Sequence, residues 1–287
     1  MMLYGAIEAG GTKFRSAVYE NGKIIDELTV PTTTPNETLD KVITFFASYS
    51  LESLGIGAFG PIIIDQTNPD FGLITQTPKV KWRNFNVLQY IKERITIPIY
   101  LNTDAGVAAL GEYWAYEGKV KNLIYITVGT GIGGAIITDG HIYAGAHHPE
   151  LGHFLIMRKK NDYHPSVCPY HDNCLEGLAS GSSLASRYQL SHSQMGERED
   201  IWDLEGYYLA QAFFDYALAF SPDKIIIGGG VSAQKKLLPA VRKYFVRMNN
   251  NYFVYDQLKD PNTFIVTPLM GNNAGLFGAY CLARGDG

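Results

Sequence analysis

Two similar glycine-rich segments limit what this chain can fold into more than any other feature of its sequence. The later one, residues 122–143, has apolar runs on both sides of a glycine-dense loop at 129–134, and the second run ends in Asp139-Gly140. Asp-Gly between apolar runs is a strong signal for a tight hairpin turn. The segment therefore predicts a strand, a glycine loop, a second strand, a turn and a third strand.

The earlier segment, residues 4–25, repeats this order of features. Gly11 in its loop precedes Gly129 by 118 residues, and Asn21 in its turn precedes Asp139 by the same 118 residues. A shared offset across loop and turn predicts a duplicated domain core with a glycine loop at the head of each half. The alternative is that glycine hairpins recur by chance in sheet proteins.

Glycine-dense loops let the backbone approach a ligand closely and point several N–H groups at an anion. The later loop also reads Gly129-x-Gly131-x-x-Gly134, which is the spacing of dinucleotide-binding loops. That fingerprint requires a helix directly after the loop. Residues 135–137, with a turn so close behind them, predict a strand instead, so a Rossmann-type site is not expected.

Length and composition narrow the class of protein. A chain of 287 residues with 46% hydrophobic and 18% charged residues is long enough for two folded domains. Its net charge of −4 disfavours nucleic acid as a partner. No apolar run reaches the roughly 18 residues that a membrane span needs, and no signal peptide is recognisable. We therefore expect a cytoplasmic protein whose three cysteines are thiols or metal ligands rather than disulfides.

Strands alternate with helix-like stretches in the first half, which predicts an α/β architecture. Asn102-Thr103-Asp104 lies where an expected strand, residues 98–101, meets an expected helix, residues 105–116. One interpretation is that Thr103 or Asp104 is simply a helix N-cap. The other is a carboxylate at the mouth of a sheet, where α/β proteins place ligands. A helix N-terminus favours the ionised form, which suits a base that accepts a proton from a hydroxyl.

A second group of residues has the spacing of a zinc site. Cys168-x-x-His171-x-x-Cys174 supplies three of the four ligands that a closed tetrahedral site needs. His153 is our choice for the fourth ligand, with His164 and His148 as rivals. The region between residues 158 and 173 has no apolar periodicity, so a structural metal worth on the order of 10 kcal/mol would order it. A chance cluster of Cys and His is the alternative.

Residues 224–231 predict a buried strand that ends in a third glycine-rich stretch. A helix is expected to begin after Ser232, so that its amino end and the backbone of Gly229 and Gly230 would form another anion-binding site.

Taken together, these residues resemble the ROK family of sugar kinases over nearly the whole chain. The subgroup that they match best is the bacterial fructokinases, because of Glu8 where many members have Asp, the Cys-x2-His-x2-Cys spacing, and Thr77-Pro78-Lys79-x-x-Trp82. The family resemblance rests on residues 8–13, 103–105 and 129–134, on Glu150-x-Gly152-His153, on residues 174–176 and on residues 228–231.

The resemblance implies an α/β protein with the duplicated actin/hexokinase-like ATPase fold, in which two domains surround a cleft. Residues 1–116 would form a small N-terminal domain, with a C-terminal helix at about 272–287 packing back onto it. Residues 117–271 would form a large domain with the zinc loop. The resemblance also suggests a homodimer.

The implied activity is ATP-dependent phosphorylation of a hexose, D-fructose to fructose 6-phosphate, with Mg²⁺ and structural Zn²⁺. Asp104 would be the base for the sugar 6-hydroxyl, and His153 would be both a zinc ligand and a sugar contact. The other implied sugar-binding residues are Asn102, Thr103, Glu150 and Glu176. The implied ATP-binding residues are Gly10, Gly11, Thr12, Lys13, Thr130, Gly131, Gly133, Gly229 and Gly230.

Several alternatives remain at this point. Many relatives have Asn-Asp where this chain has Thr103-Asp104, and Asn where it has Gly106, which bears on the sugar contacts of this loop. The alternative sugars are glucose, mannose and an N-acetylated amino sugar. A non-catalytic sugar sensor would keep the glycine loops but would not need Asp104. A hydrolase with a catalytic metal would need an open coordination position, and four candidate ligands argue against it.

Overall fold

The computed structural model describes residues 2–252 and 254–287. It divides into two compact units. The first unit contains the described residues up to Lys119, together with Ile137–His148 and Leu269–Gly287, and the second contains Val120–Ile136 and Pro149–Pro268. Residues 137–148 therefore group with the first unit, whereas the boundary expected at residue 117 put them in the second.

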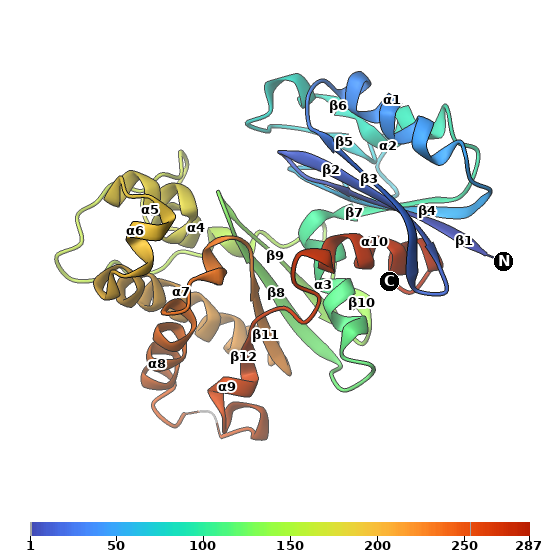
Figure 1. Ribbon diagram of the computed structural model, residues 1–287. Coiled ribbons are helices and arrows are strands. Elements are labelled where there is room, and N and C mark those ends of the chain that lie inside the picture. Colours follow the sequence, from blue (N-terminus) through green and yellow to red (C-terminus); the bar gives the residue numbers. More distant parts are fainter. Residues whose placement is uncertain (1, 253) are drawn as a thin grey trace. The chain divides into compact units, whose positions relative to one another are not determined.

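The first unit is built on a five-stranded sheet with the order β3-β2-β1-β4-β7. The first three strands are antiparallel, and β4 and β7 run parallel to β1. Helices α1 and α2 lie on one face of this sheet, and α3 and α10 lie on the other (Figure 1). The elements of the sheet and of these faces are β1 (Leu3–Ala9), β2 (Lys13–Glu20), β3 (Lys23–Pro31), β4 (Leu51–Ala58), β7 (Ile99–Thr103), α1 (Pro35–Phe46), α2 (Val87–Lys92), α3 (Asp104–Ala115) and α10 (Ala274–Arg284).

The glycines of strand β4 explain how α3 and α10 pack so closely on one face of the first sheet. Leu54 and Ile56 point to the face covered by α1 and α2 and are fully buried there. Gly55 and Gly57 point to the opposite face. A Cβ atom on Gly55 would lie 1.9 Å from the carbonyl oxygen of Ala279 in α10, so only glycine fits at this position.

The second five-stranded sheet has the order β10-β9-β8-β11-β12. This is the same arrangement as in the first sheet, a hairpin pair beside a central strand followed by two parallel strands. The duplicated core expected from the glycine hairpins is therefore confirmed. The strands are β8 (Asn122–Val128), β9 (Ile132–Thr138), β10 (His141–Ile142), β11 (Lys224–Gly228) and β12 (Ile265–Val266).

The two hairpin turns have the conformation that their sequences predict. Asn21 and Gly22 have φ of 49° and 79°, and Asp139 and Gly140 have φ of 47° and 86°. Positive φ at both central residues is the signature of the tight hairpin turn that Asn-Gly and Asp-Gly favour. A strand, β9, follows the second glycine loop, as expected for a site that is not of the Rossmann type.

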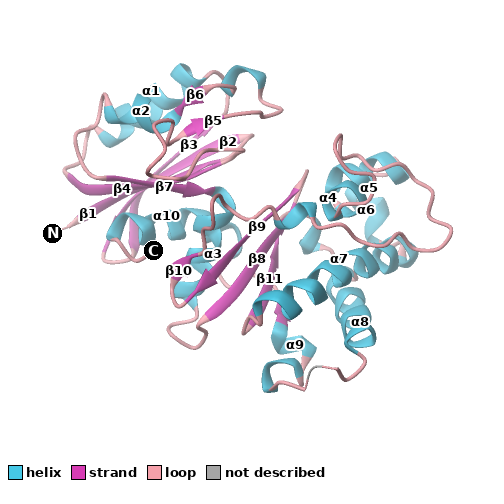
Figure 2. Cartoon of the chain, turned by 180° about the vertical axis from the view of Figure 1, so that it is seen from behind, coloured by secondary structure: helices cyan, strands magenta, loops and turns pink. Residues whose placement is uncertain are grey.

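Helices α7 and α8 lie side by side in the second unit (Figure 2). The buried face of α7 and the inner residues of β8 and β11 share one apolar core, which includes Ile124, Phe213 and Ile225. The helices of this unit are α4 (Leu175–Ala179), α5 (Gly181–Tyr188), α6 (His192–Gly196), α7 (Glu199–Phe220), α8 (Leu237–Asn249) and α9 (Pro261–Phe264). No helix in the described part of the chain is both long and apolar enough to cross a membrane.

The remaining elements are short. They are the strands β5 (Leu73–Ile74) and β6 (Phe85–Asn86) and the 3-10 turns η1 (Val80–Trp82), η2 (Leu151–His153), η3 (Val231–Ala233), η4 (Asp256–Leu258) and η5 (Gly271–Asn273).

The helix expected directly after Ser232 is absent from this position. Only the single turn η3 follows β11, and α8 begins at Leu237. Ser232 lies within this turn, and its hydroxyl donates to the carbonyl oxygen of Gly229 at 2.7 Å. The expectation of a helix N-terminus beside Gly229 and Gly230 was therefore wrong.

Candidate active site

The first glycine loop connects β1 to β2 and presents unused backbone N–H groups. The Gly10 N–H donates to the carbonyl oxygen of Lys13 at 3.1 Å, which closes the loop. Thr32 fixes it from the side, since its N–H donates to the Thr12 carbonyl oxygen and its hydroxyl donates to that of Gly10. The N–H groups of Gly11 and Thr12 have no hydrogen-bond partner among the described residues. Two adjacent free N–H groups form a suitable site for a phosphate.

The sequence left open whether Thr103 or Asp104 caps the helix and whether Asp104 faces a ligand. Thr103 is the N-cap of α3, because its hydroxyl oxygen accepts the N–H of Gly106 at 2.9 Å. Asp104 is the first residue of the helix and uses one carboxylate oxygen to accept the Ala105 N–H at 2.8 Å. The capping role therefore belongs to Thr103, and Asp104 keeps a second carboxylate oxygen for a ligand.

Asn102 accounts for the glycine at position 106. The Asn102 side-chain oxygen accepts the N–H of Thr103 at 2.8 Å. A Cβ atom on Gly106 would lie 2.4 Å from that oxygen, so a side chain at position 106 would displace Asn102. The departure from the family pattern thus has a physical reason: Gly106 makes room for Asn102 beside the Thr103-Asp104 pair.

The carboxyl group of Asp104 has a strongly shifted pKa. Asp104 still exposes surface to water, yet the atoms packed around its carboxyl group hinder its hydration and raise its pKa to about 6, against a lowering by the Ala105 N–H. A carboxylate with this pKa is ionised at neutral pH and accepts a proton more readily than an ordinary aspartate.

We expect this shift to appear in the pH dependence of catalysis. If Asp104 acts as a base, kcat/KM should fall roughly tenfold per pH unit below about pH 6, because the protonated carboxyl group cannot accept the hydroxyl proton. Steady-state rates between pH 5 and 8, with a coupled ADP assay, would measure this. A profile that stays level down to pH 5 would exclude Asp104 as the titrating base.

Glu8 lies in β1, just before the first glycine loop, and forms an ion pair with Arg15. The Arg15 Nη1 atom lies 3.4 Å from Glu8 Oε2, and Arg15 also donates to the carbonyl oxygen of Asn272 at 2.7 Å. Burial raises the pKa of the Glu8 carboxyl group, the Arg15 charge opposes this, and the Asp104 charge raises it further. Sequence reasoning gave Arg15 no role, because a single arginine in a strand belongs to no motif.

The second glycine loop connects β8 to β9 and resembles the first. The Gly129 N–H donates to the Gly131 carbonyl oxygen at 2.9 Å and closes the loop. The N–H of Ile132 donates to Glu176 Oε2 at 2.8 Å. The N–H groups of Thr130 and Gly131 make no hydrogen bond within the described part of the chain. Again two neighbouring N–H groups are free, and Gly133 lies just beyond them in β9.

Glu176 belongs to a segment that supports this loop at several points. After α4, the N–H of Gly181 donates to the Gly129 carbonyl oxygen at 2.7 Å, and the N–H of Ser182 donates to that of Thr130 at 3.2 Å. The other carboxylate oxygen of Glu176 lies 3.9 Å from His153 Nε2. Glu176 was expected to face the sugar, and its contacts also connect the glycine loop to His153.

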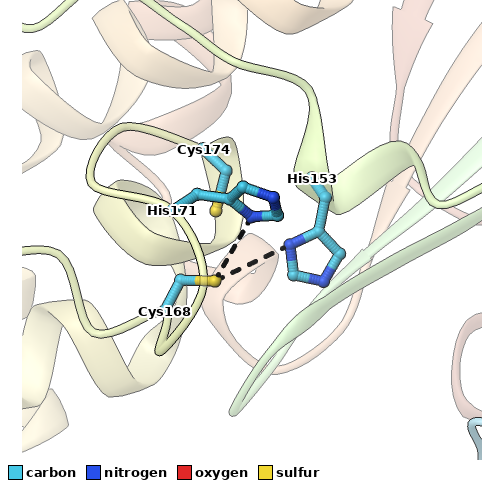
Figure 3. A group of neighbouring side chains, drawn as sticks. All are labelled: His153, Cys168, His171 and Cys174. Carbon is cyan, nitrogen blue, oxygen red and sulfur yellow. Dashed lines mark hydrogen bonds between the residues drawn. The ribbon is translucent and has the colours of Figure 1, made fainter.

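The structure brings together the four expected zinc ligands, His153, Cys168, His171 and Cys174 (Figure 3). Backbone pairing of residues 154–156 with residues 173–175 carries His153 to the side of Cys174. The Cys168 sulfur lies 3.9 Å from His153 Nδ1 and 3.6 Å from His171 Nδ1. All four donor atoms lie within 4.8 Å of one another.

This geometry fits zinc. Ligand bonds of about 2.0–2.3 Å in a tetrahedron put the donor atoms roughly 3.3–3.8 Å apart, close to the two distances given above. Burial raises the pKa of the Cys174 thiol to about 11, so that a bound cation is needed to hold it as a thiolate. His164 is not in the group, and its Nε2 instead lies 3.2 Å from the Ser186 hydroxyl. His148, the other rival, belongs to the first unit.

The last two groups of expected site residues lie in the second unit. Glu150 directly precedes the turn η2, and its carbonyl oxygen accepts the N–H of His153 at 3.0 Å. Gly229 follows β11 with a φ of 86°, and a Cβ atom there would lie 2.4 Å from the Val128 carbonyl oxygen, whereas Gly230 is open. Gly229 is thus required for close packing against the end of β8.

Comparisons with known proteins agree with one another. The sequence profile of the ROK family matches residues 4–286. A fructokinase of Pediococcus pentosaceus is 42% identical over 285 residues, which cover 99% of this chain and 98% of that protein. A fructokinase of Streptococcus mutans is 41% identical over 289 residues, which cover 98% of this chain and 97% of that protein.

A solved structure shares the fold. The crystal structure of a ROK family glucokinase from Streptomyces griseus, in complex with glucose and AMPPNP, superposes with a TM-score of 0.75 at 24% identity. The superposition covers 99% of each chain.

Proposed function

The chain belongs to the ROK family, and from this premise we propose that it is an ATP-dependent fructokinase that converts D-fructose to fructose 6-phosphate. The observation that carries the proposal is a carboxylate with a raised pKa, Asp104, in a unit whose glycine loop offers two free N–H groups. The fructokinases of similar sequence, matched over nearly their whole length, support fructose as the sugar.

The proposed reaction is a direct transfer. Asp104 accepts the proton of the sugar 6-hydroxyl, and the hydroxyl oxygen forms a bond to the γ-phosphorus of ATP. The bond between that phosphorus and the β,γ-bridging oxygen breaks, and ADP leaves with the electron pair. Phosphoryl transfer needs little covalent chemistry from the protein, and positioning and charge compensation supply most of the catalysis.

The remaining roles are assigned as the family resemblance implies. Backbone N–H groups of Gly11, Thr12, Thr130 and Gly131 bind phosphate oxygens, and these are the four free groups described above. Gly10, Lys13 and Gly133 complete the loops, and Gly229 and Gly230 take the nucleoside. Asn102, Thr103, Glu150, His153 and Glu176 bind the sugar.

Two metals are part of this proposal. Glu8, which lies in β1 just before the first glycine loop and whose carboxylate is paired with Arg15, would hold Mg²⁺ through water. Magnesium, when bound, neutralises charge that develops on the phosphates. Zinc would be structural, since the two cysteines and two histidines satisfy a tetrahedral ion and leave no position for an activated water. The zinc loop then holds His153 and Glu176 in place.

A hexose panel tests the proposal. With Mg-ATP, we expect fructose to be phosphorylated with a higher kcat/KM than glucose, mannose or N-acetylmannosamine, and ADP release without sugar to be a small fraction of that rate. The matched control is the same panel with AMPPNP, which cannot donate its terminal phosphoryl group in this way. Preference for glucose would replace fructokinase by glucokinase, and a lack of any hexose-dependent ADP release would point to a sugar sensor.

We further assign the enzyme to the cytoplasm, where ATP is available and thiols remain reduced for zinc binding. A homodimer, as the resemblance implies, is part of the same proposal.

A further inference from the structure

A lysine that the expected site does not include lies beside the first glycine loop. A Cβ atom placed on Gly11 would lie 3.5 Å from the Cε atom of Lys79. The Lys79 side chain therefore lies beside Gly11, one of the two residues of this loop whose N–H groups are free. It is exposed, and its ammonium makes no ion pair with any residue that the structure describes. Its charge is thus available to an anion bound at the loop.

The backbone that carries Lys79 is firmly anchored. Trp82, 1% exposed, packs against the rings of Phe14 and Phe59, and its Nε1 donates to the Thr33 carbonyl oxygen at 3.0 Å. Arg83 Nε donates to the carbonyl oxygen of the buried Thr77 at 2.7 Å. Both sides of the turn are therefore fixed, which lowers the entropic cost of directing one long side chain at a ligand.

The charges around the loop favour a cation there. Glu8 and Asp104 interact electrostatically, and both are carboxyl groups. A triphosphate whose terminal phosphoryl group approaches an ionised Asp104 is repelled by it. Two N–H groups offer only partial charges, whereas an ammonium supplies a full positive charge that is mobile enough to follow the moving phosphoryl group.

We propose that Lys79 is a catalytic residue of the phosphoryl transfer, whose ammonium contacts the γ-phosphoryl oxygens of ATP at the Gly11-Thr12 loop. This inference rests on the proposed function, because it takes the loop to be a phosphate site. The covalent step is unchanged: the γ-phosphorus leaves the β,γ-bridging oxygen and joins the sugar oxygen, while Asp104 takes the proton. Lys79 stays protonated and stabilises the charge on the transferred group.

The neighbouring Lys81 provides a matched control. It lies two residues further on in the same anchored turn and is also exposed. It is close enough to Glu37 to interact with that charge. Lys81→Met therefore removes one positive charge from the same turn without removing the charge beside Gly11.

The test compares Lys79→Met, Lys79→Arg and Lys81→Met in the full-length, zinc-containing protein. We expect Lys79→Met to lower kcat for fructose phosphorylation about 10²-fold or more, as loss of a preorganised charge contact does. Lys79→Arg, which keeps a cation, should restore most of this loss, and Lys81→Met should stay within about threefold of wild type. Thermal unfolding of each variant checks that the fold is kept.

Nucleotide binding separates a catalytic role from a structural one. By calorimetry with Mg²⁺, Lys79→Met should bind AMPPNP about tenfold or more weakly than wild type and bind ADP within about threefold, because only AMPPNP has a γ-phosphoryl group. Equal losses for AMPPNP and ADP, or a kcat of Lys79→Met close to that of wild type, would overturn the proposal. If the wild-type protein itself phosphorylates none of the hexoses, the proposed function is wrong, and the proposed role of Lys79 is wrong with it.

Discussion

Asp104→Asn is expected to lower the turnover of fructose phosphorylation by at least about 10²–10⁴-fold, which is the usual contribution of a general base. The substitution keeps the shape of the side chain, and its amide oxygen can still accept the N–H of Ala105. Thr103 continues to cap α3. The loss should therefore appear in kcat, with little change in the KM for either substrate, and steady-state kinetics with saturating Mg-ATP would measure it.

The same variant should not be less stable than the wild-type protein at neutral pH. The pKa of Asp104 is raised from 3.8 to about 6 in the folded chain. Its favourable contribution to folding is complete below the unfolded pKa and is lost as the pH rises through about 6, so nothing remains to be removed at pH 7.5.

Asp200→Asn is a matched control, because Asp200 is an exposed aspartate in the first turn of α7 and has no proposed role. It should leave turnover unchanged. Near-normal turnover of Asp104→Asn would remove Asp104 from its role. A large fall in the melting temperature of Asp104→Asn would mean that the Asp104 carboxylate stabilises the fold instead.

Cys168→Ala is expected to abolish zinc binding and to lower the melting temperature by about 10 °C or more. Structural zinc contributes on the order of 10 kcal/mol at neutral pH in small sites. In a domain of this size each kcal/mol shifts the melting temperature by roughly 2–4 °C, so even partial loss should be visible. Metal analysis of freshly purified protein, together with thermal unfolding, would measure both effects.

Activity should fall with the zinc, because the loop that carries three of its ligands ends in α4, where Glu176 accepts the N–H of Ile132. Cys281→Ala is the control, since Cys281 is a buried cysteine of α10 outside the cluster, and this variant should retain the metal. Wild-type protein purified without any zinc, or a Cys168→Ala variant as stable as Cys281→Ala, would contradict a structural zinc site.

Features that depend on residues close together in the sequence were predictable from the sequence. Asn21-Gly22 and Asp139-Gly140 specify their turns through the positive φ that these residues tolerate, and the repeated hairpins led to the duplicated core. The spacing of Cys168, His171 and Cys174 similarly indicated a metal cluster, and His153 joins it through the pairing of residues 154–156 with 173–175.

Features that depend on tertiary contact were not predictable in this way. Glu176 meets Ile132, and Arg15 meets Asn272, across 44 and 257 residues of sequence. Lys79 lies beside Gly11, and the turn that carries it is bonded through Trp82 to the carbonyl oxygen of Thr33, 49 residues away in sequence. The helix expected after Ser232 was wrong, since Ser232 lies in the short turn η3 and the next helix begins at Leu237.

In each glycine loop the first N–H closes the loop and the next ones remain free. Every amino acid except proline carries the same backbone N–H, so the proposed phosphate binding depends on the conformation of the loop rather than on the identity of its side chains. In the proposed site the acceptor sugar is instead bound by side chains, such as those of Asn102 and Glu150. Point substitutions can therefore change which sugar such an enzyme accepts while the backbone site for the nucleotide phosphates stays the same.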